Sequence, residues 1–371
     1  MEGAFRYHTT QVGSTASAGA SREAAAGAPV RPLHAGRMRA RPPRRGPGAR
    51  RLARAILGVT AAAVVSAGTS GAALAAPSPQ LADVAYAGSL QLVNEQQVGP
   101  AFQTATGDRY QGRGGGSFGL AQNILGGEIR PNVFMSVGAA PIQELEPKFT
   151  DWYVQFLASP LVVAYNPHTK YASALQTIAA GKRPLKDLFQ LMAQPGFHLG
   201  RTNPNTDPQG QAFVEMVELA QKRLGLPAAS VNQALRGTLS SQEIFAETAL
   251  EAQLQSGQLD AASAFLSQAI QLKLPYIALP ASLNFGDPAL ASTYAQASVK
   301  LSSGKLVHGV PLVVDATILG HTDYAAASAF LTFLLSPQGM ALYRKAGYAV
   351  LKPILFVAGL PQGVLAEIGR A

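Results

Sequence analysis

The stretch "GRGGGSFGLAQNIL" (residues 112–125) joins a glycine run to an apolar helical pattern and matches two catalytic templates. A GxGxxG pattern begins at Gly114, as in dinucleotide sites, and a GxSxG pattern centres on Ser117, as in hydrolase nucleophile elbows. Both templates need a buried strand directly before the glycines, whereas the preceding "ATGDRYQGR" is polar and charged. The sequence therefore disfavours both, and a secreted serine hydrolase using Ser117 with His308 or His321 stays as the alternative.

A third interpretation treats Ser117 as the start of a helix. Its hydroxyl would cap the first free N–H groups. Those N–H groups and the positive end of the helix dipole also form a site for anions, and the glycines let a ligand approach the backbone closely. No Lys or Arg lies between Arg113 and Arg130. An anion would thus be held by neutral dipoles, which suits reversible binding rather than chemistry.

The rest of the chain alternates short apolar runs with longer amphipathic segments. This alternation predicts an α/β fold with largely parallel sheets. The predicted strands are 83–90, 132–137, 161–167, 276–280 and 311–319. The predicted helices are 117–127, 184–194, 212–225, 246–257, 289–301 and 323–347.

Ser89 lies in "AYAGSL" (85–90), where a predicted strand ends and a polar helix-like segment follows. Ligands of open α/β sheets bind at the carboxyl ends of the strands. Ser89 and Ser117 therefore form a pair of hydroxyls, each at a strand-to-helix transition. Such a pair indicates a site for a tetrahedral oxyanion.

Residues 1–76 differ in composition from the rest of the chain. They contain 11 arginines and 2 glutamates, which account for the whole formal charge of +9. Arginines precede the short apolar run at 55–68, and Ala73-Leu74-Ala75 offers a cleavage site, as in a secretory signal peptide. We expect an exported protein beginning near Ala76, soluble and without a lipid anchor because the chain has no cysteine. The route (general secretory or twin-arginine) and a start at Met38 stay open.

Three segments resemble the extracellular solute-binding proteins of ABC importers, nearest to the molybdate/tungstate-binding family. They are "YAGSL", "GGGSFGLAQNILGGEIRPNVFMSV" and "DWYVQFLASPLVVAYNP". The resemblance continues in order through residues 200–211, 254–280 and 330–353. It implies a two-lobed periplasmic-binding-protein fold (type II) with the ligand cleft between lobes. The lobes would comprise 77–165 plus 306–371, and 166–305.

The resemblance also implies ligand-binding residues. The serine ligands of the family match Ser89 and Ser117, and backbone N–H groups would come from Gln209 and from the helix start at Glu247 and Thr248. It implies a membrane permease as partner, a monomer, no enzymatic activity and no cofactor. The neutral charge of residues 77–371 argues against nucleic acid as a partner, and scattered histidines give no metal-site spacing.

Two positions depart from the family pattern. Phe265 stands where bacterial molybdate binders have a tyrosine hydroxyl. Of the two carboxylates that archaeal tungstate binders add, Asp207 matches one and the other falls on Ala264, so an octahedral site completed by both carboxylates is not expected. Asp207 also fits ordinary turn chemistry before a proline. The sequence therefore leaves the ligand open among molybdate or tungstate, sulfate, phosphate and a neutral solute such as a sugar.

Overall fold

The computed structural model describes residues 78–235, 242–320 and 324–358. The chain divides into two compact units, Met1–Ala73 and Leu74–Ala371, and the description below concerns the second unit. The predicted signal peptide and His321 lie outside the described residues.

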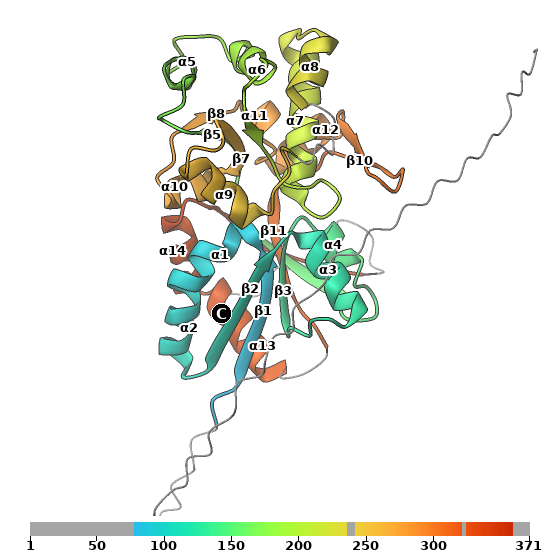
Figure 1. The fold of residues 1–371 in the computed structure, drawn as a ribbon. Coiled ribbons are helices and arrows are strands. Elements are labelled where there is room, and N and C mark those ends of the chain that lie inside the picture. Colours follow the sequence, from blue (N-terminus) through green and yellow to red (C-terminus); the bar gives the residue numbers. More distant parts are fainter. Residues whose placement is uncertain (1–77, 236–241, 321–323, 359–371) are drawn as a thin grey trace, which may run out of the picture. The chain divides into compact units, whose positions relative to one another are not determined.

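The larger sheet has six strands in the order β12-β4-β11-β3-β1-β2 (Figure 1). Strand β1 pairs in parallel with both β2 and β3, whereas β11 and β12 run antiparallel to their neighbours. Strands β3 and β11 lie in the centre of this sheet, and every residue of both strands is buried. The strands are β1 Leu81–Ala87, β2 Arg109–Gly115, β3 Val133–Val137, β4 Trp152–Ala158, β11 Val313–Ile318 and β12 Ala349–Val357.

The smaller sheet has four strands in the order β6-β7-β5-β8. Only β6 and β7 are parallel. A separate antiparallel hairpin, β9 with β10, precedes the return to the larger sheet. The strands are β5 Leu161–Tyr165, β6 Leu199–Gly200, β7 Ala261–Phe265, β8 Tyr276–Ala278, β9 Ser298–Lys300 and β10 Leu306–His308.

Helices cover both faces of the larger sheet. One face packs against α2 and α13, whose rings Phe102 and Phe330 meet edge to face at 5.2 Å. The opposite face packs against α3 and α4 in a smaller apolar cluster around Phe134 and Ile142. The helices of this part are α1 Gln91–Val93, α2 Gly99–Thr106, α3 Ser117–Gly126, α4 Ala140–Gln143, α13 Tyr324–Leu335 and α14 Pro337–Lys345, with helical turns at Gly88–Leu90 and Asn94–Val98.

The smaller sheet has its own helices, of which α7 is the longest. Eleven of its 17 residues are buried, so it forms the centre of this half. The helices here are α5 Ala172–Ala179, α6 Lys186–Met192, α7 Pro208–Leu224, α8 Ala228–Leu235, α9 Glu247–Gln255, α10 Leu266–Gln271, α11 Ala281–Asn284 and α12 Ala291–Tyr294, with a 3₁₀ turn at Pro288–Leu290.

The α/β class predicted from the sequence is confirmed, and the two main sheets agree with the periplasmic-binding-protein fold that the resemblance implied. The prediction of largely parallel sheets is wrong, because most strand pairs are antiparallel. The helix predicted over 289–301 is also wrong, because it ends at Tyr294 and the chain enters β9. The first crossing between sheets lies between β4 and β5, slightly before the boundary at residue 165 that the resemblance suggested.

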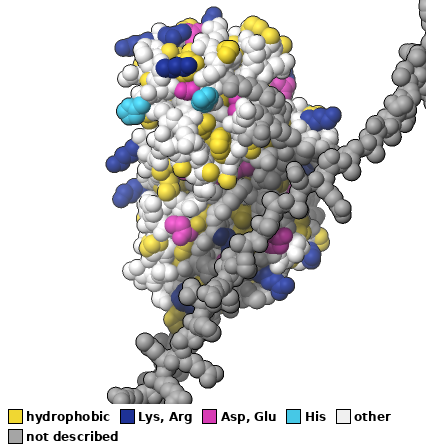
Figure 2. All heavy atoms as spheres, in the orientation of Figure 1, with side chains coloured by type: hydrophobic (Ala, Val, Ile, Leu, Met, Phe, Trp, Pro, Cys, Tyr) yellow, Lys and Arg dark blue, Asp and Glu magenta, His cyan; other side chains and the backbone are white. Residues whose placement is uncertain are grey.

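No single helix among the described residues is long and apolar enough to span a membrane. Helices α13 and α14 together have the required length and composition, but they are bent by 62° at the break between them. On the face drawn in Figure 2, lysines and arginines lie in small groups with acidic side chains between them. That distribution agrees with the balanced charge of this part of the sequence.

Candidate functional site

The candidate site lies where β1 and β2 end side by side. The two strands are paired along their whole length, from Leu81 opposite Arg109 to Ala87 opposite Gly115. The chain then turns into a 3₁₀ helix that contains Ser89 and into α3, which begins at Ser117. The structure thus places both predicted serines at one edge of the sheet, with side chains 3% and 1% exposed.

Ser117 is held by the neighbouring strand rather than by its own helix. Its Oγ accepts a hydrogen bond of 3.1 Å from the backbone N–H of Val137, at the end of β3. The residue that caps α3 is Gly116, and no side chain caps this helix. The prediction that Ser117 is the N-cap is therefore wrong. The reason is that the hydroxyl accepts from the backbone N–H of Val137, the last residue of β3, instead of from its own helix.

The first turn of α3 contacts the loop before α7. The backbone N–H groups of Phe118 and Gly119 both donate to the carbonyl oxygen of Thr206, at 3.1 and 3.2 Å. Gly116 makes this approach possible, because a Cβ there would lie 2.5 Å from that oxygen. Within the described chain, no protein group accepts a hydrogen bond from the N–H of Ser117. One donor of this helix end is therefore available to a ligand.

Asp207 follows directly and caps α7. Its Oδ1 accepts a hydrogen bond of 2.9 Å from the backbone N–H of Gln209. The N–H that the resemblance assigned to a ligand is thus bonded to Asp207 in this structure. Asp207 is 6% exposed, and burial raises the pKa of its carboxyl group to about 6 although the hydrogen bond from the Gln209 N–H opposes the shift.

Glu247 brings a second carboxyl group to the same place. It is the first residue of α9, and its side chain is 6% exposed. Its Oε2 lies so close to Gly88 that a Cβ on that glycine would be 2.2 Å away. Burial, and then the nearby charges of Asp207 and Glu251, raise its pKa well above the usual range, while hydrogen bonds from Gln268 and from the Ser89 N–H oppose this.

A buried amide network fixes the orientation of Glu247. Its Oε1 accepts hydrogen bonds from the side-chain amides of Gln268 at 2.9 Å and Gln209 at 3.4 Å. The Oε1 of Gln209 in turn accepts from Ser263 Oγ at 2.7 Å. All four residues are at most 6% exposed. The carboxylate is therefore held against the Gly88–Ser89 turn rather than free to rotate.

The other positions singled out from the sequence, Thr248, Phe265 and Ala264, do not bring side chains to the candidate site. The side chain of Thr248 is exposed, so only the helix start that it shares with Glu247 faces the site. The ring of Phe265 lies in the main hydrophobic core, and its backbone N–H donates to Gln268 at 2.9 Å. Ala264 belongs to an apolar cluster with Leu250 and Leu259. The second carboxyl group comes from Glu247, not from position 264.

Sequence reasoning missed three contributors: Gly88, Thr206 and Gln268. Thr206 contributes only its backbone carbonyl, which leaves no side-chain signal. Gln268 lies on α10, three residues after the position that the family pattern singles out, and a polar residue at 2% exposure there is visible only in the folded structure. For Gly88 a signal existed, because a glycine beside a candidate ligand-binding serine often marks a close approach.

A cavity of about 720 Å³ adjoins the α3–α7 contact. It is lined by Phe118 of α3, by Pro208 of α7 and by the β10 hairpin strand with Val307 and His308. Its walls therefore come from the segments of both sheets. It offers a route from solvent toward the first turn of α3.

The chain crosses twice between the two sheets, and the candidate serines, helix starts and carboxyl groups lie near these crossings, an arrangement that suits the binding of a small polar ligand. Residues 82–349 match the model of the bacterial extracellular solute-binding protein family. This chain belongs to that family. It is accordingly a binding protein and not an enzyme, and the burial of Ser117 agrees, since a nucleophile elbow needs an exposed serine.

Several relatives are similar over most of this chain. A Haloferax volcanii protein, provisionally named an ABC transporter molybdenum-binding protein, is 32% identical over 68% of this chain and 76% of its own length. The molybdate/tungstate-binding protein of Pyrococcus abyssi is 30% identical over 60% of this chain and 69% of its own. The periplasmic molybdate-binding protein of Azotobacter vinelandii superposes with a TM-score of 0.48 at 19% identity, over 72% of this chain and 99% of its own.

Proposed function

We propose that this protein captures molybdate or tungstate outside the cytoplasmic membrane and delivers it, as a monomer, to the permease of an ABC importer. The observation that carries the proposal is the convergence of Asp207 and Glu247 with the Ser89 turn and the start of α3. The names of the Haloferax and Pyrococcus relatives support the same ligand class. The predicted signal peptide supports export.

The ligand-binding residues in this proposal belong to two groups. Ser89, the N–H of Ser117 and the start of α9 at Glu247 and Thr248 supply hydrogen-bond donors to the oxygens of the oxyanion. Asp207 and Glu247 supply carboxyl oxygens. Gln209 acts through its amide, which orients Glu247.

Two carboxyl groups beside a dianion need an explanation, because like charges in a buried site repel strongly. Sulfur in sulfate and phosphorus in phosphate are fully coordinated and cannot accept a further oxygen. Molybdenum and tungsten in their oxyanions can take additional oxygen ligands. A carboxylate that coordinates the metal atom turns the repulsion into a bond, so this pair favours molybdate and tungstate over sulfate.

A thermal-shift screen tests the proposal directly. Molybdate, tungstate, sulfate, phosphate and a panel of neutral sugars are added separately to the full protein. A ligand that binds only the folded state stabilises it by about 2.7 kcal/mol at a hundredfold excess over its Kd. We expect stabilisation by molybdate and tungstate and little by sulfate or phosphate. Stabilisation by sugars with none by any oxyanion would refute the proposed site.

A further inference from the structure

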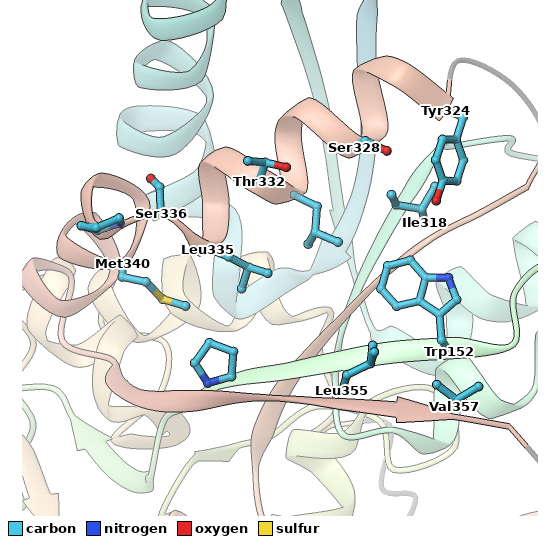
Figure 3. Close-up of a pocket in the computed structure, with 13 residues that line it drawn as sticks. Trp152, Ile318, Tyr324, Ser328, Thr332, Leu335, Ser336, Met340, Leu355 and Val357 are labelled. Atoms are coloured by element: carbon cyan, nitrogen blue, oxygen red, sulfur yellow. The ribbon is translucent and has the colours of Figure 1, made fainter. Parts of the chain in front are cut away.

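A large apolar groove lies on the larger sheet, far from the β1–β2 edge that forms the candidate site. Its volume is about 1000 Å³. Helices α13 and α14 form one wall and strands β4 and β12 form the floor (Figure 3). Ten of the 13 lining residues are apolar; in chain order the lining comprises Trp152, Ile318, Tyr324, Ser328, Leu331, Thr332, Leu335, Ser336, Pro337, Met340, Pro353, Leu355 and Val357.

The groove exists because the helices cover this face of the sheet unevenly. Helices α2 and α13 pack over β1, β2 and β11. Over the outer pair, β4 and β12, the side chains of Trp152, Leu355 and Val357 stay only partly buried, and Tyr324 at the rim is 63% exposed. An apolar face of this size that no described segment covers normally has a partner.

We propose that the partner is the chain's own segment 359–371, "GLPQGVLAEIGRA", docked in the groove as a short amphipathic helix. The chain leaves β12 at the groove itself, since Val357 pairs with Trp152 and the N–H of Ala358 donates to the carbonyl of Asp151 at 2.6 Å. The described chain therefore ends at the rim of the groove, where this segment begins.

The sequence of this segment matches the groove in pattern and in length. Leu360, Val364, Leu365 and Ile368 recur at the spacing of one helix face, and Pro361 suits a first helical turn. A helix over residues 360–368 would be about 14 Å long. The floor strand spans roughly 13 Å from Pro353 to Val357. Gly363 weakens the helix in isolation, so packing on the groove would supply its stability.

Two properties of the chain make the groove easy to monitor. Trp152 is the only tryptophan, and there is no cysteine. The fluorescence of the full protein therefore reports on the floor of the groove. Replacing Ser328, a lining residue on α13, by cysteine places the only thiol of the protein inside the groove (Figure 3).

The test compares two neighbouring substitutions in the full chain carrying Ser328→Cys. Leu365→Asp puts a charge on the docking face, whereas Ala366→Asp puts the same charge about 100° further round the helix, toward solvent. Labelling of the thiol is followed together with Trp152 emission. We expect Leu365→Asp to accelerate labelling at least about tenfold and to shift the emission to the red, because undocking exposes the groove. Ala366→Asp should leave both unchanged.

A chain ending at Ala358 serves as the second variant and should match Leu365→Asp in both readouts. Equal and fast labelling in all variants would overturn the proposal, because the groove would then be open. Protection that survives Leu365→Asp would also overturn it, because another segment would then cover the groove. Protection that grows with protein concentration would assign the groove to a second copy of the chain instead.

Discussion

At the scale of single residues, Glu247 would decide how the proposed oxyanion ligand is held. Its buried carboxyl group has two ways to coexist with a dianion. It can keep its proton and donate it to an oxyanion oxygen, which its raised pKa permits. Alternatively, it can ionise and coordinate the metal atom. A glutamine at this position can still donate through its amide, but it is a much weaker ligand for the metal.

The substitution Glu247→Gln therefore separates the two mechanisms. Under the coordination proposed here, molybdate affinity should fall by about 1.5–3 kcal/mol, roughly tenfold to hundredfold in Kd. Calorimetric titration measures it. Glu251→Gln, one turn further along α9, is the matched control, because it removes a nearby charge without touching the site. Unchanged molybdate affinity in Glu247→Gln would leave proton donation as the role of this residue.

Ser117 has a structural role that can be measured without any ligand. Its hydroxyl is the partner of the Val137 N–H in a region that is 1–4% exposed. Ser117→Ala leaves that N–H buried without an acceptor, so we expect the free energy of unfolding to fall by about 1–3 kcal/mol. Chemical denaturation of the ligand-free protein checks this. The exposed Ser303→Ala should change stability by less than about 0.5 kcal/mol, and an equally small change at Ser117 would contradict the bond.

The residues of the site differ in how far the sequence could indicate them. Ser89, Ser117 and Asp207 lie at ends of strands and helices, and such ends have local signatures. The carboxylate of Glu247 was overlooked, because the resemblance placed this contribution at Ala264. The orientation of the Glu247 side chain depends on contacts with Gly88, 159 positions before it, and with Gln268, 21 positions after it. That information is tertiary.

At the scale of elements, the contact between α3 and the loop before α7 joins the segments of the two sheets. Gly116→Ala should disrupt it, because the added Cβ would lie 2.5 Å from the Thr206 oxygen although the backbone, with φ −60°, accepts alanine. We expect a loss of about 1–3 kcal/mol in stability and weaker ligand binding.

Gly119→Ala, one turn along the same helix, is the matched control for Gly116→Ala. Its Cβ would be 3.7 Å from Thr206 Cβ, an ordinary contact. Alanine is also the better helix former by about 1 kcal/mol. Differential scanning calorimetry should therefore give a higher melting temperature for Gly119→Ala and a lower one for Gly116→Ala. If both variants melted alike, the close approach at Gly116 would not matter for stability.

Strand β2 explains which elements a sequence can reveal. Its residues "RYQGRGG" are exposed or half-buried, because it lies at the edge of the sheet and its glycines add no apolar signal. The strand was missed for that reason, and the two catalytic templates were judged partly on its absence. The buried strands β3, β5 and β11 were predicted nearly to the residue, because burial on both faces leaves continuous apolar runs.

At the scale of the whole molecule, buried carboxyl groups link stability to pH. Burial raises the pKa of Asp315 and Glu215 to about 8 and that of Glu251 to about 7. In Asp315 the Oδ2 atom has no hydrogen-bond partner among the described residues, and Gln155 contacts Oδ1 at 3.4 Å. Unfolding returns these groups to values near 4. Between about pH 4 and pH 8 the folded state therefore binds more protons than the unfolded state.

The sign of the effect follows from that difference in bound protons, since stability falls with rising pH wherever the folded state holds more of them. We expect the ligand-free protein to lose unfolding free energy between pH 5 and pH 8, up to roughly 10 kcal/mol for the three groups together at about 1.4 kcal/mol per group and pH unit. Urea denaturation at both pH values measures it. Asp315→Asn should flatten the dependence by removing one such group, whereas Asp151→Asn, at an exposed carboxyl group, should not. A stability that rises from pH 5 to pH 8 would contradict the prediction. It would mean that these carboxyl groups are already ionised at low pH in the folded protein, stabilised by charged partners or water.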